Sequence, residues 1–222
     1  MKLPPKLLAL AAAAMLSQSV FAQTAGNWLW RAGATSLMPS VSGGVLSAPS
    51  LPDSRVDVNQ VTQVAGGITY MVTDNFAVDV PVAPPFTHNL TGAGALQGVG
   101  KVAQVDVLPM SVFAQYRFLD AHARFRPYVG LGATYAYFFN PQGSAALTGM
   151  TNPGGPSTTL TVDSRFTLTP QLGFSLALGE QFSLEMAFTK SLLKTNTKLS
   201  TGQTSEINLD PSSLSVGLGF RF

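Results

Sequence analysis

Few residues of this chain could do covalent chemistry, and they are far apart. There is no Cys, and the two His are His88, which we expect at a loop, and His122, which we expect in a short turn at the opposite rim. A nucleophile needs a base within hydrogen-bond reach. Ser is abundant, but no Ser, His and acid stand at a recognisable spacing. With no metal-ligand, phosphate-loop or dinucleotide spacing either, we predict no enzyme, no metal site and no cofactor.

A second group consists of charged residues inside alternating apolar stretches. Each occupies the small or polar face of its stretch: Arg31, Asp79, Arg117, Glu185 and Arg221. Isolated charges in a confined space are costly, but three Arg and two carboxylates can largely neutralise one another. We expect Asp79 to pair with Arg117, and Arg31 and Arg221 to face each other with Glu185 or water between them. This chemistry needs strands that bring the five side chains together.

The clearest strand is the end of the chain, residues 214–222. Every second residue there is large and apolar, whereas the residues between are Ser215, Gly217, Gly219 and Arg221. A soluble barrel would place charged residues on its second face. A greasy face towards lipid and a small face towards a narrow lumen fit this pattern instead. The final aromatic, Phe222, is typical of a strand recognised by the outer-membrane assembly machinery.

The beginning of the chain predicts export. Residues 1–22 contain Lys2 and Lys6, an apolar run, and Ala22 at the end of a signal-peptidase site. Cleavage after Ala22 leaves 222 − 22 = 200 residues with 13 − 2 = 11 basic and 11 acidic side chains. No basic stripe suggests nucleic acid. Charged residues are only 11% of the chain, against roughly 25% in soluble domains.

The mature chain, 23–222, is long enough for eight membrane-spanning strands. Short turns at 73–75, 119–125 and 179–181 alternate with four long loops at 39–57, 88–104, 140–159 and 195–208. Short turns on one rim and long loops on the other are typical of outer-membrane barrels. We therefore predict an all-β fold, an eight-stranded antiparallel transmembrane β-barrel with periplasmic turns and extracellular loops. We expect a monomer embedded in outer-membrane lipid.

The direction of each strand determines whether its lumen-facing residues lie near the periplasmic or the extracellular end. The five charged residues fall near the periplasmic end, as a plug or as ordinary filling of a narrow barrel. The upper lumen is expected to be a shallow apolar funnel lined by Leu37, Ala65, Ala83, Phe113, Thr134 and Ala136. Prolines cannot donate ladder hydrogen bonds. Pro81, Pro84 and Pro85 therefore predict a weak place in the wall, where a hydrophobic solute could leave sideways.

Several segments together resemble the outer membrane protein W (OmpW) family over most of the mature chain. They are 30–33 (WRAG), 70–75 (YMVTDN), 85–88 (PFTH), 108–109 with 114–116, 126–130 (RPYVG), and 209–211 with the closing GFRF. The resemblance implies an eight-stranded bacterial outer-membrane barrel that passes small hydrophobic molecules. In the family pattern a Trp follows Asp-Ser at the start of the sixth strand, whereas here Asp163-Ser164 precedes Arg165. The resemblance thus implies a more polar pocket floor.

Three functions remain open on the sequence. We favour passive entry of small hydrophobic molecules through the apolar funnel, with lateral exit. The alternative is a structural, receptor or adhesion barrel whose extracellular loops bind a partner. Those loops carry mainly Gly, Pro, Ser and Thr, with few aromatic or charged anchors, which disfavours it. A soluble lipocalin-like barrel is third, because the outer face lacks charge.

Overall fold

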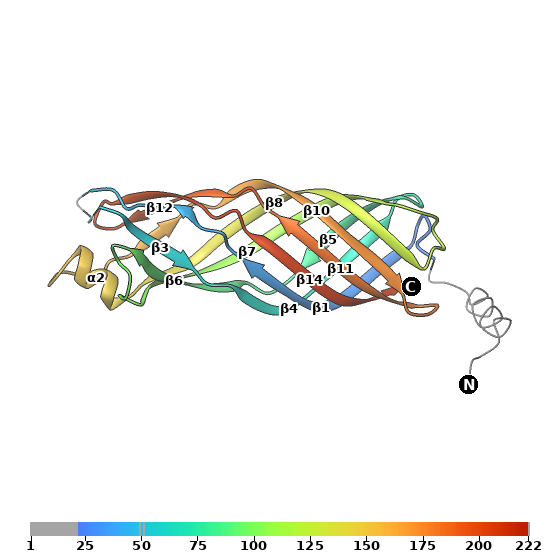
Figure 1. Cartoon of the computed structure of the whole chain (residues 1–222), viewed down its shortest axis with the longest axis horizontal. Helices are drawn as coiled ribbons and strands as arrows, with labels where there is room; N and C mark the ends of the chain where they lie inside the picture. Colours follow the sequence, from blue (N-terminus) through green and yellow to red (C-terminus); the bar gives the residue numbers. More distant parts are fainter. Residues whose placement is uncertain (1–21, 49, 51, 222) are drawn as a thin grey trace, which may run out of the picture.

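The computed structural model describes residues 22–48, 50 and 52–221. These residues form a closed antiparallel barrel of eight staves, each consisting of one strand or of two consecutive strands (Figure 1). The predicted fold class is therefore confirmed. The signal peptide predicted at 1–22, except Ala22 itself, and the terminal Phe222 lie outside the described residues.

The staves follow one another around the barrel in chain order. They are β1 (Trp28–Met38), β3 (Ser54–Val58) with β4 (Val61–Met71), β5 (Phe76–Val82) with β6 (Phe86–Gly94), β7 (Lys101–Arg117), β8 (Phe125–Gly143), β9 (Leu160–Val162) with β10 (Arg165–Ala177), β11 (Phe182–Lys190) with β12 (Lys194–Leu199), and β13 (Thr204–Asn208) with β14 (Ser212–Arg221). The last stave pairs with the first, Trp30 opposite Phe220, which closes the wall. A two-residue strand, β2 (Ser42–Gly43), joins β13.

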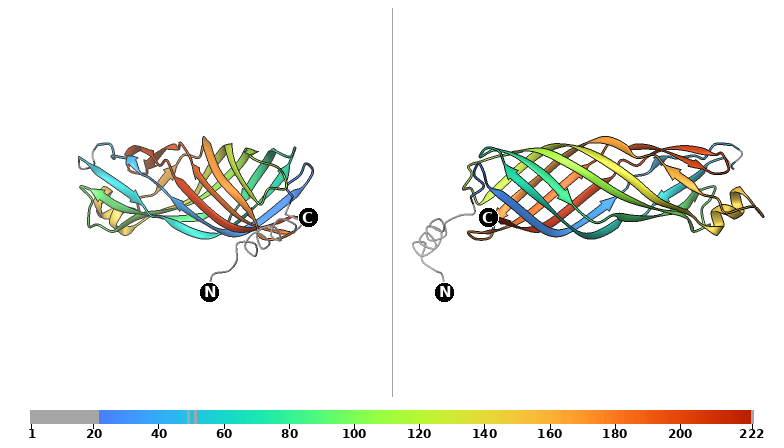
Figure 2. Two further views of the ribbon diagram at one scale, coloured as in Figure 1. Left: turned by 45° about the vertical axis from the view of Figure 1, so that its right-hand side comes forward. Right: turned by 180° about the vertical axis from the view of Figure 1, so that it is seen from behind.

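The three predicted short turns are confirmed between β4 and β5, β7 and β8, and β10 and β11. In the first turn the backbone N–H of Phe76 donates to Thr73 Oγ1 at 2.9 Å. The described C-terminal end of β14 lies at the same end of the barrel as these turns (Figures 1 and 2). The sequence pattern predicts that this end faces the periplasm, and the two ends of the barrel are called periplasmic and extracellular on that basis.

Two of the predicted loops are largely strand. Residues 88–104 contain most of β6 and the start of β7, and 195–208 form the β12–β13 hairpin, in which Thr197 pairs with Ser205. The interpretation gave too much weight to Gly and polar content. Lys194, Thr195, Thr197 and Lys198 alternate between the two faces, which is a strand signal without an apolar face. The barrel wall therefore continues beyond the lipid.

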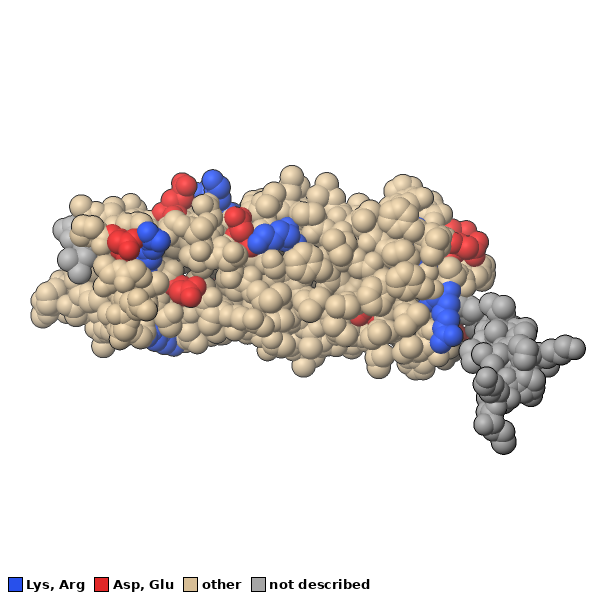
Figure 3. Space-filling model, in the orientation of Figure 1, with Lys and Arg blue, Asp and Glu red and all other residues tan. Residues whose placement is uncertain are grey.

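The outward surface is apolar over the middle of the barrel. Trp30 is 47% exposed and Leu131 is 56% exposed, so these side chains face lipid rather than a core. Figure 3 shows that most charged side chains on the visible face gather over the end that carries β12 and β3. On the outer face Thr87 Oγ1 donates to an Asp106 carboxylate oxygen at 2.6 Å. We place the extracellular limit of the apolar belt below this pair.

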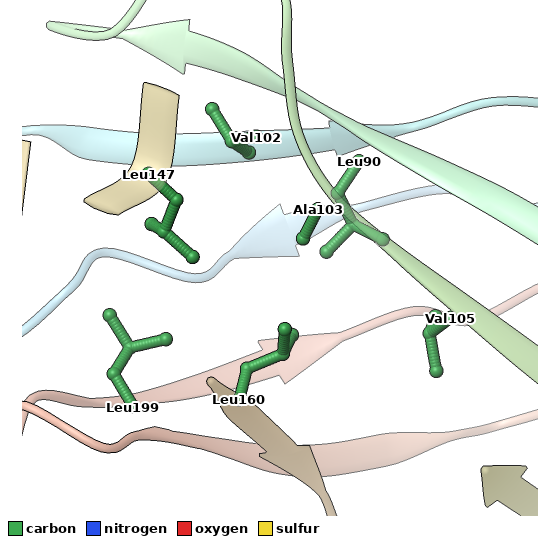
Figure 4. Close-up of a cluster of buried hydrophobic side chains, with 7 residues drawn as sticks. All are labelled: Leu90, Val102, Ala103, Val105, Leu147, Leu160 and Leu199. Carbon is green, nitrogen blue, oxygen red and sulfur yellow. The ribbon is translucent and has the colours of Figure 1, made fainter. Parts of the chain in front are cut away.

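Buried aliphatic side chains fill the barrel at its extracellular end. The helix α2 (Ala145–Thr151), which lies between β8 and β9, contributes Leu147. Figure 4 shows Leu147, Leu160 and Leu199 pointing towards one another from α2, β9 and β12. We call the set the extracellular cluster: Leu90, Val102, Ala103, Val105, Leu147, Leu160 and Leu199. None of the helices among the described residues could cross a membrane.

Candidate functional site

The lower lumen is organised by an ion pair between Arg31 on β1 and Asp79 on β5. Both guanidinium Nη atoms contact the carboxylate, and Nη2 lies 2.9 Å from Oδ2. Thr69 on the strand between them also donates to Asp79. The predicted Asp79–Arg117 pairing is wrong. Arg31 reaches Asp79 because Gly67, its register partner on β4, leaves space for the guanidinium.

Arg117 is held by neutral groups instead. It is 1% exposed, and its Nη atoms donate to Gln23 Oε1 at 2.7 Å and to Gln115 Oε1 at 3.0 Å. Its guanidinium carbon also lies 4.8 Å from the centre of the Tyr128 ring, a cation–π contact. Amide oxygens and an aromatic face thus hold this buried guanidinium, although its Nε has no hydrogen-bond partner among the described residues.

A sixth charged residue, Arg126, joins this end of the lumen. It is also 1% exposed and donates to the backbone oxygens of Gln23, at 3.1 Å, and Asp74, at 2.6 Å. The sequence interpretation missed it. It precedes the inward-facing Tyr128 by two residues, so strand alternation alone would have placed it in the lumen.

The two remaining predicted charges lie in the same region with different partners. Glu185 Oε1 accepts hydrogen bonds from Ser175 Oγ at 2.6 Å and Ser183 Oγ at 2.7 Å. Arg221 donates to the backbone oxygen of Ala22 at 2.9 Å. In the register of the closing pair, Arg221 lies opposite Leu29 rather than Arg31. The expected Arg31–Arg221 juxtaposition is therefore wrong by two residues.

The N-terminal segment completes this region. The side chain of Gln23, 1% exposed, donates to Ser175 Oγ at 2.7 Å, and its backbone N–H donates to Ala121 at 2.9 Å. Gln23 thus links three staves across the lumen. We call this layer the polar floor: Gln23, Arg31, Asp79, Arg117, Arg126 and Glu185. These largely buried side chains occupy the lower lumen, which in a barrel of eight strands is just wide enough for side chains to fill.

Above the floor lie two small cavities. The lower cavity, of about 110 Å³, is lined by five residues of the expected path, Leu37, Ala65, Ala83, Phe113 and Thr134. The upper cavity, of about 80 Å³, is lined by Ala136 and again by Leu37. Thr134, Pro109 and Ser191 line both cavities, so the two adjoin. Leu90 and Val105 of the extracellular cluster also line the upper cavity, so the expected apolar path is divided between two adjoining cavities below that cluster.

The barrel wall is interrupted beside the lower cavity. The β5–β7 ladder ends at Asp79 opposite Phe113, and the β6–β7 ladder resumes at Phe86 opposite Val107. Between them, residues 80–85 have no ladder partner on β7 in the described part of the chain. On the other side, the ladder between β4 and β5 ends at Val82. We call residues 80–85 the wall break; it contains Pro81, Pro84 and Pro85.

Comparison with known proteins identifies the family of this chain. The family model described as the OmpW family matches residues 24–222. The chain belongs to the OmpW family. It is 31% identical to outer membrane protein W of Vibrio cholerae serotype O1 over 217 residues, which covers 95% of both chains.

Solved structures agree on the fold. The crystal structure of OprG from Pseudomonas aeruginosa superposes with a TM-score of 0.81 at 24% identity, covering 93% of this chain and 99% of OprG. The solution structure of the E. coli outer membrane protein W gives a TM-score of 0.58 at 27% identity, covering 90% and 100%. This OmpW-family chain is accordingly an outer-membrane barrel embedded in lipid, in a family without enzymatic activity.

Arg165 does not play the part that the resemblance implied. It stands where the OmpW-family pattern has a Trp, but its guanidinium lies 3.0 Å from Asp163 Oδ2 with both side chains about half exposed. Arg165 lines neither cavity. The lining near this position comes instead from Val162 and Thr167. Arg165 therefore adds no charge to the lining of either cavity.

His88 is also placed differently from our prediction. It lies within β6 rather than at a loop, is 3% exposed and lines the upper cavity. His122 lies in the β7–β8 turn, where its Nδ1 is 3.2 Å from Asp120 Oδ1. The two His are thus at opposite ends of the barrel. The described residues contain no group of three or more His, Cys, Asp or Glu that could hold a metal ion.

Proposed function

We propose that this OmpW-family barrel passes small hydrophobic molecules from outside the cell into the outer membrane. A solute would occupy the upper cavity and then the lower cavity, and would leave sideways through the wall break. The family resemblance supports hydrophobic solutes as the class. Apolar side chains also form most of the upper cavity's lining and part of the lower cavity's, which includes Arg31, Gln171 and Glu185 as well. Apolar surface gains free energy by burying apolar ligands.

The observation that carries the proposal is the position of the wall break. Pro81, Val82 and Ala83 belong both to the segment without a partner on β7 and to the lining of the lower cavity, although Pro81 and Val82 still pair with β4. Across from them, Pro109 on β7 also lines the cavity. Proline has no N–H to donate, so prolines on both sides keep the backbone from closing the ladder. Our sequence interpretation overlooked the contribution of Pro109.

The polar floor explains why the exit would be lateral. A hydrophobic solute moving down would have to displace hydrogen bonds among buried charged and amide groups. Leaving such groups unpaired costs about 1–3 kcal/mol each. Moving through the wall break exchanges one apolar environment for another. The lateral route is therefore the less costly one for an apolar molecule.

Entry of two solutes of similar size, one hydrophobic and one hydrophilic, tests the proposal in cells with and without the protein. We expect only the hydrophobic solute to enter faster with the protein. Faster entry of both would make the barrel a small aqueous pore. No change for either would refute transport and direct attention to the extracellular surface as a binding site for a partner.

Replacing Pro81, Pro84 and Pro85 with Val tests the route. The substitutions restore backbone donors, so we expect slower entry of the hydrophobic solute with normal assembly. Gln63 Nε2 now donates to the Pro84 oxygen at 2.6 Å, a contact that Val can keep through its own carbonyl. Unchanged entry in a correctly assembled variant would overturn the lateral route.

A further inference from the structure

The upper cavity contains one titratable side chain among its described lining residues, His88. Its Nδ1 lies 2.8 Å from the backbone oxygen of Asn59. A carbonyl oxygen can only accept, so Nδ1 carries the proton. In a neutral imidazole the other nitrogen, Nε2, is then a hydrogen-bond acceptor.

No described residue occupies His88 Nε2. In the described part of the chain, the hydrogen bond to the Asn59 oxygen is the only one that the His88 side chain makes. Nε2 is absent from the set of fully buried side-chain nitrogen and oxygen atoms that lack a hydrogen-bond partner, so this atom retains some accessible surface. Because the residue is 3% exposed and lines the upper cavity, the accessible nitrogen opens to the cavity.

The hydroxyl groups of the same lining are mostly engaged by the wall. Thr167 Oγ1 donates to the Leu192 oxygen at 2.7 Å, and Thr195 Oγ1 donates to the Asp163 oxygen at 2.6 Å. Thr134 and Ser191 share their hydroxyls with Thr169. Among the described residues, Thr197 is the lining hydroxyl that has no such partner. The cavity thus offers a ligand an apolar surface with a neutral acceptor at His88.

Anionic ligands fit this lining poorly. A carboxylate would be buried with no cation in the lining, which is costly. A neutral Nε2 also has no proton to donate to an anion. Burial lowers the pKa of His88 below its ordinary value, so the imidazole stays neutral near pH 7. A hydroxyl group, in contrast, can donate to Nε2 and recover the hydrogen bond it loses on leaving water.

We propose that His88 anchors the head group of an uncharged hydroxyl-bearing amphiphile, such as a medium-chain alcohol or an alkylphenol, and selects it over an alkane of the same length. The alkyl chain would extend past Leu37 and Val107 towards the lower cavity. This proposal rests on the proposed passage of hydrophobic solutes, and names which of them the site favours.

Titration of the full-length protein in lipid nanodiscs with 1-octanol and, separately, octane tests the anchor directly. With ¹⁵N-labelled His, we expect 1-octanol to shift the Nε2 resonance of His88, and octane to leave it near its starting position. The Nε2 resonance of His122 is the internal control. An unmoved His88 resonance at saturating 1-octanol would overturn the proposal, and no variant is needed to reach that result.

Entry of the same two solutes into cells tests selection. His88→Phe keeps a ring of similar size without the acceptor, and should slow entry of 1-octanol about threefold to tenfold, which corresponds to one lost neutral hydrogen bond. Octane entry should not slow. His88→Gln, which keeps an acceptor, should restore part of the 1-octanol rate, and His122→Phe should behave as the unaltered protein.

The outcomes separate this proposal from the proposed function. If His88→Phe slows both solutes equally, His88 is structural and selection is overturned, while protein-dependent entry still stands. If entry of neither solute depends on the protein, the proposed function fails. In that case the Nε2 titration alone decides whether His88 binds a hydroxyl group.

Discussion

Arg31 and Asp79 form a two-point ion pair that spans β4, with the guanidinium packed against the backbone of Gly67. Asp79 is fully buried. The pair therefore forms without solvent on the carboxylate side, in the lumen of a barrel surrounded by lipid. The ion pair joins β1 to β5 across the strand between them, and so connects parts of the polar floor that do not share a ladder.

Removing one partner of this pair should be costly. Arg31→Met leaves the Asp79 carboxylate buried with only Thr69 as a side-chain donor. We expect a loss of about 3–5 kcal/mol in the free energy of unfolding, measured by urea unfolding in detergent micelles. The double variant Arg31→Met with Asp79→Leu should recover much of the loss. Equal destabilisation by the single and double variants would contradict the assignment.

Gly67 should tolerate no larger residue. A Cβ at this position would lie 2.5 Å from Cζ of Arg31, so Gly67→Ala should displace the guanidinium and cost about 1–3 kcal/mol by overpacking. Gly149→Ala is the matched control, because nothing lies within 4 Å of a Cβ there and Ala favours the helix. Equal unfolding midpoints for the two variants would argue against the packing of Arg31 on Gly67.

Gln23 should control the permeability of the floor. Gln23→Ala removes the oxygen that accepts from Arg117 and the donor to Ser175. Gln23 lies between the guanidinium groups of Arg117 and Arg126, which carry like charge. We therefore expect water to enter between them and single-channel conductance in planar bilayers to rise. Gln97→Ala, at an exposed extracellular position, should leave the conductance unchanged. A closed Gln23→Ala barrel would show that other floor contacts suffice.

His88 should make stability depend on pH. It lies beyond the outward Thr87–Asp106 pair and so outside the apolar belt. Burial lowers its pKa in the folded state, whereas in the unfolded chain it binds a proton below about pH 6.5. The unfolded state therefore binds more protons in this range, and the free energy of unfolding should fall as the pH drops through 6.5. The urea midpoint of His88→Gln should fall less steeply, and parallel curves would refute this origin.

The barrel could be predicted because its main signal, the alternation of apolar and small residues along each strand, can be read from the sequence alone. Strand alternation in 214–221 and in 126–139 fixes which side chains face lipid, and the structure keeps those faces. Pairing inside the lumen depends on stagger between staves and on side-chain reach. Arg31 crosses β4 to Asp79 because Gly67 has no side chain, a relation that no single strand reveals. The role of Gln23 in the polar floor could not be predicted either, because Gln23 lies outside any strand and no alternation assigns it to the lumen.

The wall break could be predicted only in part. Pro81, Pro84 and Pro85 mark a place where donors are missing, and the structure leaves 80–85 outside the β7 ladder. The position of the cavity behind that segment needed the three-dimensional register. The opposite error occurred at 195–208, where strands rich in Thr and Lys had no apolar face to distinguish them from a loop.

A reversible lock across the wall break tests the central claim most directly. If the register of Asp79 and Phe113 continues, Pro81 lies opposite Ser111, and both line the lower cavity. Since the chain has no Cys, Pro81→Cys with Ser111→Cys introduces one disulfide, whose formation is read from gel mobility. Ser36→Cys with Thr62→Cys is the control, because these paired hydroxyls lie 3.0 Å apart in the intact β1–β4 ladder and line neither cavity. The account predicts that oxidation stops hydrophobic entry in the first variant, that reductant restores it, and that the control is unaffected; unchanged entry through the locked wall would contradict lateral exit.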